Sequence, residues 1–469
     1  MKKDRRDFLK TSCGALSMVA LATQMRHFGL INSLAQTKEN GDAENYKALV
    51  CVFLIGGNDS NNSVVPNYDE GYNQYAAARQ AQGLAIARNT LLPIMPPAMS
   101  GQTYGFNPNL SELHTLWQQN KLAVVANVGT LIQPLTRAQY LGGAARPLQL
   151  FSHPDQENQF KTVVSNYRSS VGWGGRLADK MAGQNVGAAI PMISQLSSGT
   201  SVYTIGNTST PLMVSPAPTP LNQVLTLNGF TDADAATRRA AMNNIRQADL
   251  SYTMTQAASN LTQQAINVSQ QLSTDPVLTV TFPSTALGNQ LKQVAKLMKF
   301  RTDLNMKRQI FYVQLDGFDT HSSQMSPHAS LLRQVSPALK AFYDETVAQG
   351  ISENVTTFTM SDFNRTLNPS GSGSSVGSDH GWGGHHFVIG GSVLGGNFYG
   401  KPTANGTVFP TLVTSGPDDA DTRGRIIPTV AVEQYASTLA RWFGLAPADL
   451  PLVFPNINSF VGTDLGFMM

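Results

Sequence analysis

Short apolar runs alternate with stretches of helical periodicity along most of the chain. The first run covers residues 47–55 (KALVCVFLI) and ends in the turn residues Gly56-Gly57-Asn58-Asp59. A run that is apolar at every position predicts a strand buried on both faces, as in a parallel sheet that helices cover. Further strands are predicted over residues 122–128, 310–315, 355–360 and 386–389.

Helical patterns lie between and after these runs, over residues 111–120, 173–182, 327–349 and 432–443. The alternation predicts an α/β fold with a mainly parallel central sheet and helices on both faces. A polar stretch rich in Ala, Gln and Asn, together with the Thr/Pro/Ser-rich stretch before it, predicts a helical insertion at about residues 198–275. We expect the remainder of residues 46–460 to form one domain.

The first 35 residues have the pattern of a twin-arginine signal peptide. Arg5-Arg6 precede a weakly apolar run, and the small-residue site Ser33-Leu34-Ala35 follows it. The run is short and contains Ser, Thr and Gly, which favours cleavage after export over a stable membrane span. We therefore expect a periplasmic or secreted protein that uses the twin-arginine export machinery and keeps no membrane span.

Charge and cysteine content narrow the classes of partner. Residues 1–35 contain six of the 33 Lys/Arg and two of the 30 Asp/Glu residues, so the mature chain is close to neutral. A nucleic-acid partner is not expected, because it requires a concentrated basic face. Cys13 lies in the signal and Cys51 in the first apolar run. Cys51 is therefore predicted to be a packed core residue without an intramolecular disulfide.

Carboxylates and imidazoles follow the predicted strands, at the strand ends where open α/β sheets bind their ligands. The residues are Asp59 after the first run, Asp316, Asp319 and His321 after the third, and Asp362 after the fourth. Taken singly, the acids could equally be turn or capping residues. Together, they predict a site at one edge of the sheet.

The segment 378–386 (SDHGWGGHH) holds three of the eight histidines of the chain. Asp379-His380 is difficult to explain as a turn, and we expect it to bind metal. One of His385 and His386 could instead be a packed histidine, because His386 begins an apolar run. Imidazole combined with carboxylate favours a divalent zinc or manganese ion over calcium.

Several motifs appear in a fixed order: FLIGGNDSNN, DGFDTH, SDFNRT, SDHGWGGHHFVIGG and RIIPTVAVEQYASTLARWFG. In this order they resemble the DUF1501 family of exported proteins over about residues 46–460, which is more specific than any one motif. That family is similar to the alkaline phosphatase and sulfatase superfamily. Members of this superfamily hold one or two metals with Asp and His at strand ends and transfer phosphoryl or sulfuryl groups. The resemblance implies an alkaline phosphatase-like fold.

The resemblance also implies roles for individual residues. The implied metal ligands are Asp59, Asp316 or Asp319 with His321, Asp362, and His380 with the help of Asp379. Phe363 stands where the superfamily has a histidine. The number of metals is therefore left open.

The nucleophile implied by the resemblance is Ser152, in the segment FSHPD, with His153 as a ligand or a base. A helix N-cap explains Ser152 equally well. Ser60, beside Asp59, is the second candidate. Arg365 could clamp an oxyanion with two hydrogen bonds, or it could pair with Asp362.

The predicted function is that of an exported, metal-dependent hydrolase of phosphate or sulfate esters, with a small molecule or a glycan as substrate. The alternative is a non-catalytic envelope or secretion-associated protein that retains the fold and binds a metal or an anionic glycan. If the predicted ligands lie together in one pocket and a hydroxyl group points into it, the first function is favoured. Without such a hydroxyl group, a binding function, or hydrolysis by direct attack of water, is favoured.

Overall fold

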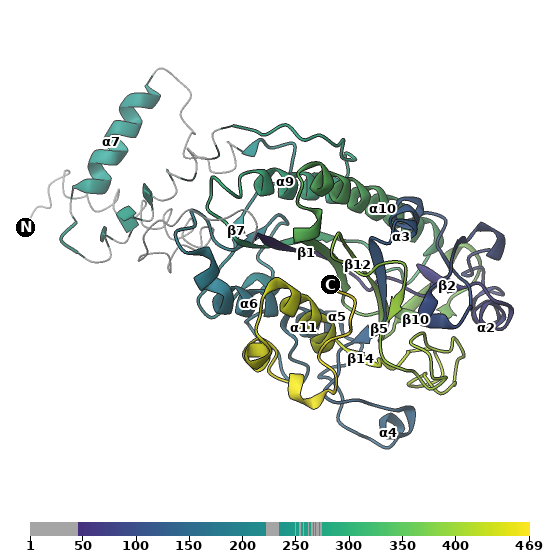
Figure 1. The fold of residues 1–469 in the computed structure, drawn as a ribbon. Coiled ribbons are helices and arrows are strands. Elements are labelled where there is room, and N and C mark those ends of the chain that lie inside the picture. The colour runs from purple at the N-terminus through teal and green to yellow at the C-terminus, as the bar shows by residue number, and fades with distance from the viewer. Residues whose placement is uncertain are drawn as a thin grey trace, which may run out of the picture.

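A central sheet with helices on both faces organises the chain in the computed structural model (Figure 1). The structure describes residues 46–221, 234–248 and 275–469, together with scattered positions between 250 and 274. The predicted signal peptide, residues 1–35, lies outside the described residues. Part of the predicted insertion also lies outside them.

Nine strands form the central sheet in the described part of the chain, in the order β13-β5-β12-β9-β1-β8-β6-β7, with β14 also paired to β5. Their bounds are β1 Lys47–Leu54, β5 Leu122–Gly129, β6 Ile193–Gln195, β7 Leu212–Met213, β8 Arg308–Leu315, β9 Val355–Ser361, β12 Gly384–Gly390, β13 Phe398–Tyr399 and β14 Val430–Ala431. Every pairing is parallel except those of β12 with β5 and β9. The predicted mainly parallel sheet is confirmed, with one reversed strand.

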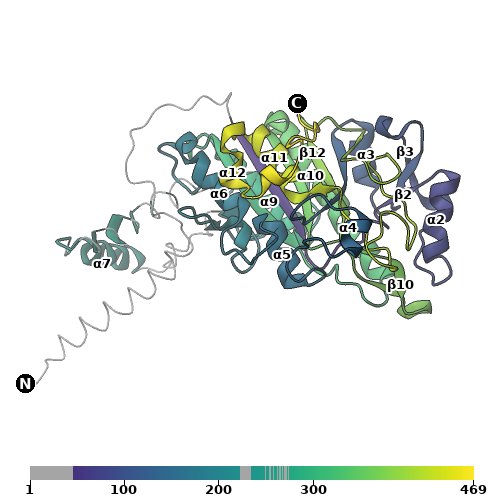
Figure 2. The same cartoon turned by 90° about the horizontal axis from the view of Figure 1, so that it is seen from below.

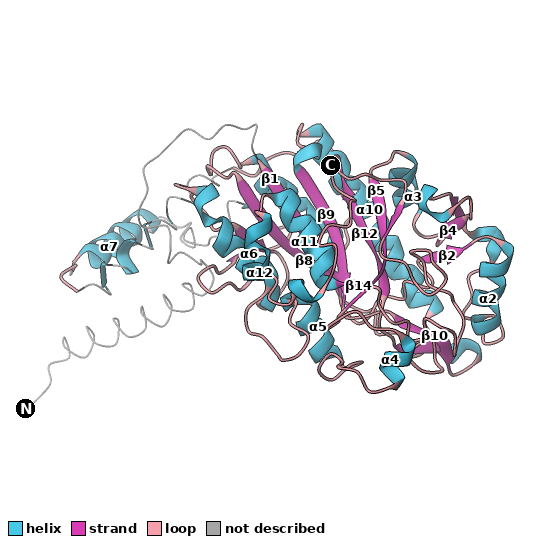
Figure 3. Cartoon of the chain, turned by 60° about the horizontal axis from the view of Figure 1, so that its bottom comes forward, coloured by secondary structure: helices cyan, strands magenta, loops and turns pink. Residues whose placement is uncertain are grey.

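The side chains of β1 alternate between two buried cores. Ala48, Val50 and Val52 pack in the core that contains the apolar residues of α3, α9 and α10, whereas Leu49 and Phe53 pack with those of α5, α6 and α11. The helix bounds are α3 Ser111–Gln118, α9 Ala286–Lys299 and α10 Met325–Ala348 on one face, and α5 His153–Thr162, α6 Trp173–Met181, α11 Val432–Phe443 and α12 Leu450–Val453 on the other. Figure 3 shows the helices in front of and behind the strands. A run that is apolar at every position is thus explained by burial on both faces.

A smaller region lies at one end of the molecule (Figure 2). It contains an antiparallel sheet of order β2-β4-β3 and the antiparallel hairpin β10-β11. The bounds are β2 Val64–Pro66, β3 Leu92–Ile94, β4 Tyr104–Phe106, β10 Arg365–Ser370, β11 Gly377–His380 and α2 Asp69–Arg79. Outside this region, the short helix α4, Arg137–Leu141, packs through Tyr140 against Trp382. Short 3-10 helices cover Arg88–Thr90, Pro97–Met99, Ala182–Asn185, Val202–Thr204, Ser352–Asn354, Gly373–Ser375, Pro447–Asp449 and Ile457–Ser459.

The segment predicted to be an insertion begins within the sheet. β7 pairs in parallel with β6 at the edge of the central sheet. Helix α7, Ala235–Gln247, lies apart from the layers around the sheet (Figure 1). Of the helices that the structure describes, none combines the length and the apolar character needed to cross a bilayer.

Helix α11 contains one fully buried acid. Glu433 lies in the first turn of α11 and is fully buried. Burial raises the pKa of Glu433 to about 8, although the charge of Arg176 acts in the opposite direction. The folded protein therefore holds a proton on Glu433 at pH values where the unfolded chain has lost it.

This difference predicts that the stability of the protein depends on pH through Glu433. The pKa is about 8 in the folded state and 4.5 for the free group, so the free energy of unfolding falls as pH rises from 4.5 to 8. Glu433→Gln removes this dependence, and the Tm of the variant relative to wild type rises between acidic and mildly alkaline buffer by a few degrees. Calorimetric scans at several pH values measure the change.

The matched control is Glu70→Gln, which removes an exposed acid from the first turn of α2. Its Tm difference from wild type is expected to stay constant over the same pH range. A Glu433→Gln difference that is equally constant would contradict the assigned protonation.

Candidate metal centre

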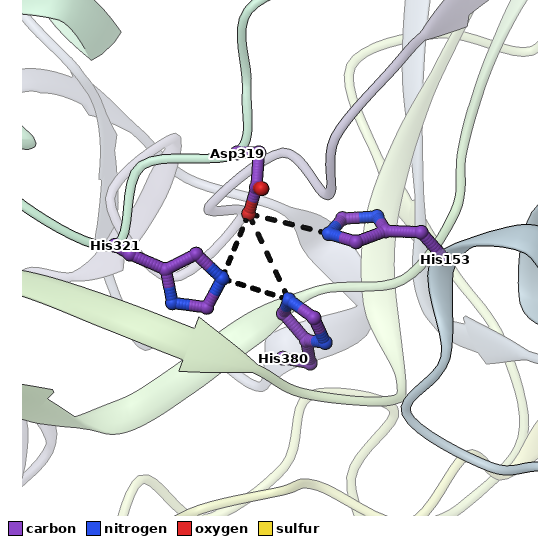
Figure 4. Close-up of side chains that lie close together, drawn as sticks. All are labelled: His153, Asp319, His321 and His380. Atoms are coloured by element: carbon purple, nitrogen blue, oxygen red, sulfur yellow. Dashed lines mark hydrogen bonds and ion pairs between the residues drawn. The ribbon is translucent and has the colours of Figure 1, made fainter.

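Ring nitrogens of three histidines converge on one carboxylate oxygen (Figure 4). Asp319 Oδ1 lies 3.2 Å from His153 Nε2, 3.0 Å from His321 Nε2 and 3.7 Å from His380 Nε2. One ligand atom from each of the four residues lies within 4.8 Å of all the others. The four side chains thus form one cluster of donors.

The four residues come from three distant parts of the chain. His153 is the first residue of α5, Asp319 and His321 follow β8, and His380 ends β11. The turn after β1 packs against the same place, since a Cβ atom on Gly56 would lie 2.3 Å from the amide nitrogen of Asp319. Gly56 has a φ of +110°, which also excludes ordinary side chains. The carboxyl end of the parallel strand β8 therefore delivers Asp319 and His321, as open α/β sheets do, whereas His153 comes from the start of a helix and His380 from the antiparallel hairpin β10-β11.

Each of the three imidazoles has its second ring nitrogen bound to an oxygen of the protein. The pairs are His153 Nδ1 with Asp362 Oδ2 at 2.7 Å, His321 Nδ1 with Asp379 Oδ1 at 3.0 Å, and His380 Nδ1 with the Phe151 carbonyl at 2.7 Å. Metal-binding histidines in proteins are held in the same way, by a carboxylate or carbonyl on the other nitrogen. The arrangement fixes the orientation of all three rings.

The same contacts decide which nitrogens carry protons. Burial acts to raise the pKa of Asp379, but a hydrogen bond from Ser370 and the nearby Arg423 help to lower it to about 2. This ionised carboxylate and a carbonyl can only accept, so Nδ1 of His321 and Nδ1 of His380 are both protonated. In the neutral rings the two Nε2 atoms, 2.8 Å apart, then carry facing lone pairs. A cation at this point removes the repulsion.

His153 completes the cluster with an unused donor atom. Its buried Nε2 lies near Asp319 but has no partner in hydrogen-bonding geometry among the residues that the structure describes. Burial acts to lower the pKa of His153, but Asp362 and Asp319 together raise it above the usual value. The ring is therefore attractive to a proton or a metal ion, which would compete for Nε2.

The donor set fits a divalent metal ion. Four ligands at roughly 2.0–2.2 Å around a tetrahedral ion lie about 3.3 Å from one another. Four of the six separations among the donor atoms, 2.8, 3.0, 3.2 and 3.7 Å, lie around this value, and all six are within 4.8 Å. The chemistry of the donors, three imidazoles and one carboxylate, is suited to such an ion.

Arg365 anchors the carboxylate of the cluster. Its side chain is fully buried, and Nη1 donates to Asp319 Oδ1 at 2.8 Å and to the Gly56 carbonyl at 3.2 Å. Nη2 donates to the Ser378 carbonyl in β11. The carboxylate partner of Arg365 is thus Asp319 rather than Asp362. Its charge therefore acts on the carboxylate on which the three imidazoles converge.

Phe363 occupies the position where the resemblance implied an imidazole. The ring is buried, stacks on His380 at 4.7 Å between centroids, and lies 4.6 Å from the ring of His153. An aromatic wall on the inner side of the cluster keeps water away from these two histidines.

Asp59 lies outside the cluster, in a buried ion pair with Arg79. The carboxylate oxygens of Asp59 lie 2.6 and 3.1 Å from two nitrogens of Arg79, and Gln324 donates to the same carboxylate. Burial acts to raise the pKa of Asp59, but Arg79 and Gln324 hold it below the usual value. The resemblance implies that the negative charge of Asp59 binds a metal ion. In this structure the guanidinium of Arg79 balances that charge instead. Sequence reasoning did not find Arg79, because an arginine at a helix end has no distinguishing signal.

The other predicted site residues fall into two groups. Asp362 and Asp379 support the cluster through His153 and His321 and do not belong to its donor atoms. Asp316 is exposed and lies outside the cluster. Of the predicted ligands, Asp319, His321 and His380 therefore belong to the cluster, whereas Asp362 and Asp379 contact its histidines.

The Ser152 hydroxyl points to a neighbouring acid. Ser152 Oγ donates to Asp155 Oδ2 at 2.7 Å, and Arg168 Nε binds the other oxygen of Asp155 at 2.7 Å. Ser152 precedes α5 as its N-cap residue, without a side-chain cap bond. Ser60, the second candidate, has a buried hydroxyl without a partner among the described residues.

His385 and His386 are packed in the core. His385 stacks on Phe409 and accepts the N–H of Asn127 on Nδ1, whereas His386 stacks on Tyr435. Burial lowers the pKa of both histidines to about 3. Both rings are therefore neutral, and neither belongs to the cluster.

Comparisons with known proteins give a family and three distant structures. No curated protein matches the chain. The PsFucS1 sulfatase from Pseudoalteromonas sp. is 10% identical, with coverage of 90% of this chain and 77% of that chain and a TM-score of 0.34. The Listeria monocytogenes lipoteichoic acid synthase LtaP is 9% identical, with coverage of 78% and 69% and a TM-score of 0.30. Ps i-CgsB, in complex with k-i-k-neocarrahexaose, is 10% identical, with coverage of 89% and 77% and a TM-score of 0.34. The family described as "Protein of unknown function (DUF1501)" matches residues 46–449, and the chain belongs to this family.

Proposed function

We propose that this protein is a metal-dependent hydrolase of phosphate or sulfate esters. The observation that carries the proposal is the convergence of three imidazole Nε2 atoms on Asp319 Oδ1, with every second ring nitrogen bound to a protein oxygen. Histidines oriented in this way are prepared to bind a metal ion. The ligands would be His153, Asp319, His321 and His380.

Zinc or manganese is the proposed metal. Three nitrogen donors and one oxygen donor suit these ions, whereas calcium prefers six to eight oxygen ligands. When bound, such an ion supplies a Lewis acid that offsets negative charge on a phosphoryl or sulfuryl group.

The surrounding residues leave one side of the cluster open to substrate. Phe363 closes the inner side, whereas the side chains of Asp319 and His321 are 47% and 45% exposed. An ester could therefore approach from the solvent side. Arg365 holds Asp319 during this approach and, being fully buried, does not itself reach the substrate.

Water is the nucleophile that we favour over Ser152. The Ser152 hydroxyl donates to Asp155. The hydrogen bond from Arg168 is the main cause that lowers the pKa of Asp155, so this carboxylate is a weak base. Ser152 therefore lacks an adjacent group able to take its proton.

One observation favours the second candidate function, that of a non-catalytic envelope or secretion-associated protein that binds metal. Four protein ligands complete a tetrahedral shell, as in structural zinc sites, whereas catalytic sites usually keep a position for water or substrate. A metal held in this way could still contribute to binding an anionic glycan. Assays of hydrolysis at full metal occupancy separate the two functions.

We also propose that the protein is exported through the twin-arginine machinery to the periplasm or beyond. The support for this proposal is the sequence pattern of residues 1–35.

The first prediction of the metal proposal concerns binding. Purified mature protein is expected to bind one zinc or manganese ion per chain, measured by elemental analysis and by chelator competition. His321→Ala is expected to lose the metal. Asp379→Asn, which removes a brace but no ligand, is expected to weaken metal affinity about 10- to 100-fold.

The control for binding is His114→Ala, which removes a half-buried histidine on α3 whose Nε2 contacts the Pro93 carbonyl. It should bind metal as wild type does. Full metal occupancy in His321→Ala would place the metal elsewhere.

The second prediction concerns hydrolysis. Metal-loaded wild type is expected to hydrolyse an aryl phosphate or an aryl sulfate, and His380→Ala to lower kcat/KM more than about 100-fold, because it removes a ligand. Ser152→Ala should retain metal and turnover if water attacks. Loss of all turnover in metal-loaded Ser152→Ala would instead identify Ser152 as the nucleophile. Absence of turnover with both ester classes at full occupancy would favour the non-catalytic function.

The third prediction concerns export. Replacing both Arg5 and Arg6 with Lys should keep the precursor in the cytoplasm, detected by fractionation and by the mass of the uncleaved chain. Lys2→Gln, which changes a neighbouring cation outside the pair, serves as the control. Normal export of the double-lysine variant would exclude the twin-arginine route.

A further inference from the structure

A tightly bound loop borders the metal centre. Residues 415–425 wrap around the buried Asp419 carboxylate, which accepts four backbone N–H groups, from Ser415 and Gly424 at 2.8 Å and from Asp421 and Arg425 at 3.0 Å. From the outside of this loop, Arg137 Nε donates to the Asp419 carbonyl at 2.8 Å. Four charge-assisted hydrogen bonds to one carboxylate hold the backbone of the loop in a single shape.

The loop places two arginines against the residues of the centre. Arg423 Nη2 lies 2.5 Å from Asp379 Oδ2, and Asp379 orients His321 through its other oxygen. Arg425 Nε donates to the His380 carbonyl at 2.9 Å. One carboxylate and one imidazole ring thus separate Arg423 from the donor atom of His321.

These contacts leave donors of both arginines unused. Among the described residues, Nε and Nη1 of Arg423 have no hydrogen-bond partner, and the side chain is 37% exposed. Arg425 binds Asp421 with Nη1 at 2.8 Å, while its Nη2 has no partner in the same set of residues. The guanidinium of Arg425 lies 4.2 Å from the centroid of the Phe151 ring, which fixes its plane.

Both arginines contact residues that hold the cluster and are themselves partly exposed, since their side chains are 37% and 21% exposed for Arg423 and Arg425. Asp379 contacts both His321, whose side chain is 45% exposed, and the partly exposed Arg423. Guanidinium groups with free, pre-oriented N–H donors recognise phosphate and sulfate oxygens, often with two parallel hydrogen bonds. Each arginine already pairs with one acid, so their affinity for an anion comes from directed hydrogen bonds rather than from net charge.

We propose that Arg423 and Arg425 bind a second anionic group of the substrate. The preferred ester then carries two phosphate or sulfate groups, one at the metal and one at the arginines. This substrate class rests on the proposed hydrolase function, whereas the anion site itself does not require turnover.

Binding of matched probes to metal-loaded protein tests the site. Isothermal titration compares glucose 1,6-bisphosphate with glucose 6-phosphate, and a disulfated disaccharide with its monosulfated form. In at least one pair, the probe with two anionic groups is expected to bind about tenfold or more tightly. The pair that shows the preference identifies phosphate or sulfate as the favoured anion. Equal affinities within both pairs would overturn the proposal.

Variants assign the preference to the arginines. Arg423→Gln and Arg425→Gln should each reduce the affinity ratio of the two probes, and together they should abolish it. Arg441→Gln is the control, because Arg441 is 34% exposed and forms one ion pair, with Asp464, on α11. A ratio that survives in both glutamine variants would contradict the proposal.

Metal content separates substrate binding from a purely structural effect. Arg423 also contacts Asp379, so Arg423→Gln could loosen His321. Arg423→Lys keeps a positive charge beside Asp379 but lacks the guanidinium donors, and it should retain metal while losing the preference. Retained preference in metal-loaded Arg423→Lys would exclude a role for the guanidinium.

The outcomes distinguish failure of this inference from failure of the proposed function. A preference for two-anion probes without turnover of any ester would support the anion site and contradict the hydrolase. Turnover of esters with equal affinity for both members of each pair would support the hydrolase and contradict the anion site.

Discussion

Three imidazole nitrogens that face one carboxylate oxygen need a positive charge among them, and much of the surrounding structure follows from this constraint. Asp362, Asp379 and the Phe151 carbonyl occupy the outer nitrogens, which directs the lone pairs inward. Arg365 supplies a permanent charge on Asp319 and is itself held by two backbone carbonyls. The site is thus arranged by the protein before any ion binds, which reduces the reorganisation needed on binding.

The buried charge of Asp59, near the cluster, is neutralised by a side chain of the protein. Asp59 and Arg79 are both fully buried, and Arg79 also donates to two carbonyls in β10. Removing either partner of such a pair costs about 3–5 kcal/mol, because the other charge is left uncompensated. Through Gln324, which also accepts from Ser378, the pair supports the strand that ends in His380. The guanidinium therefore does for Asp59 what a bound cation would otherwise do.

The sequence was informative where one physical requirement determined the residue pattern. The apolar runs of β1, β8 and β9 predicted buried parallel strands, since burial on both faces permits few other residues. The direction of β12 could not be predicted, because hydrophobicity does not encode strand polarity. Edge strands such as β13 and β14, of two residues each, are too short to leave a pattern.

At the site, clustering in sequence predicted part of the geometry. Asp319, His321 and His380 follow strand ends and lie together, and His153, weighed as a ligand or a base, joins them. The arginines that balance or contact the acids and histidines of the site could not be predicted from the sequence. Arg79, Arg423 and Arg425 act through contacts between distant segments. His385 and His386 show the converse, since histidines beside a site motif can belong to the core.

The reversed direction of β12 shapes how the chain can assemble. β9, the β10-β11 hairpin and β12 follow one another without a crossover helix, and β12 pairs directly with β9. Residues 355–390 therefore form contacts of low sequence separation, and closing them costs less loop entropy than bringing β1 to β8 across the intervening chain. This segment contains Asp362, Asp379 and His380. One of the four donor residues, His380, and two acids that hold the other rings thus lie in a contiguous unit whose contacts are local, while His153 and the β8 loop must reach it through long-range folding.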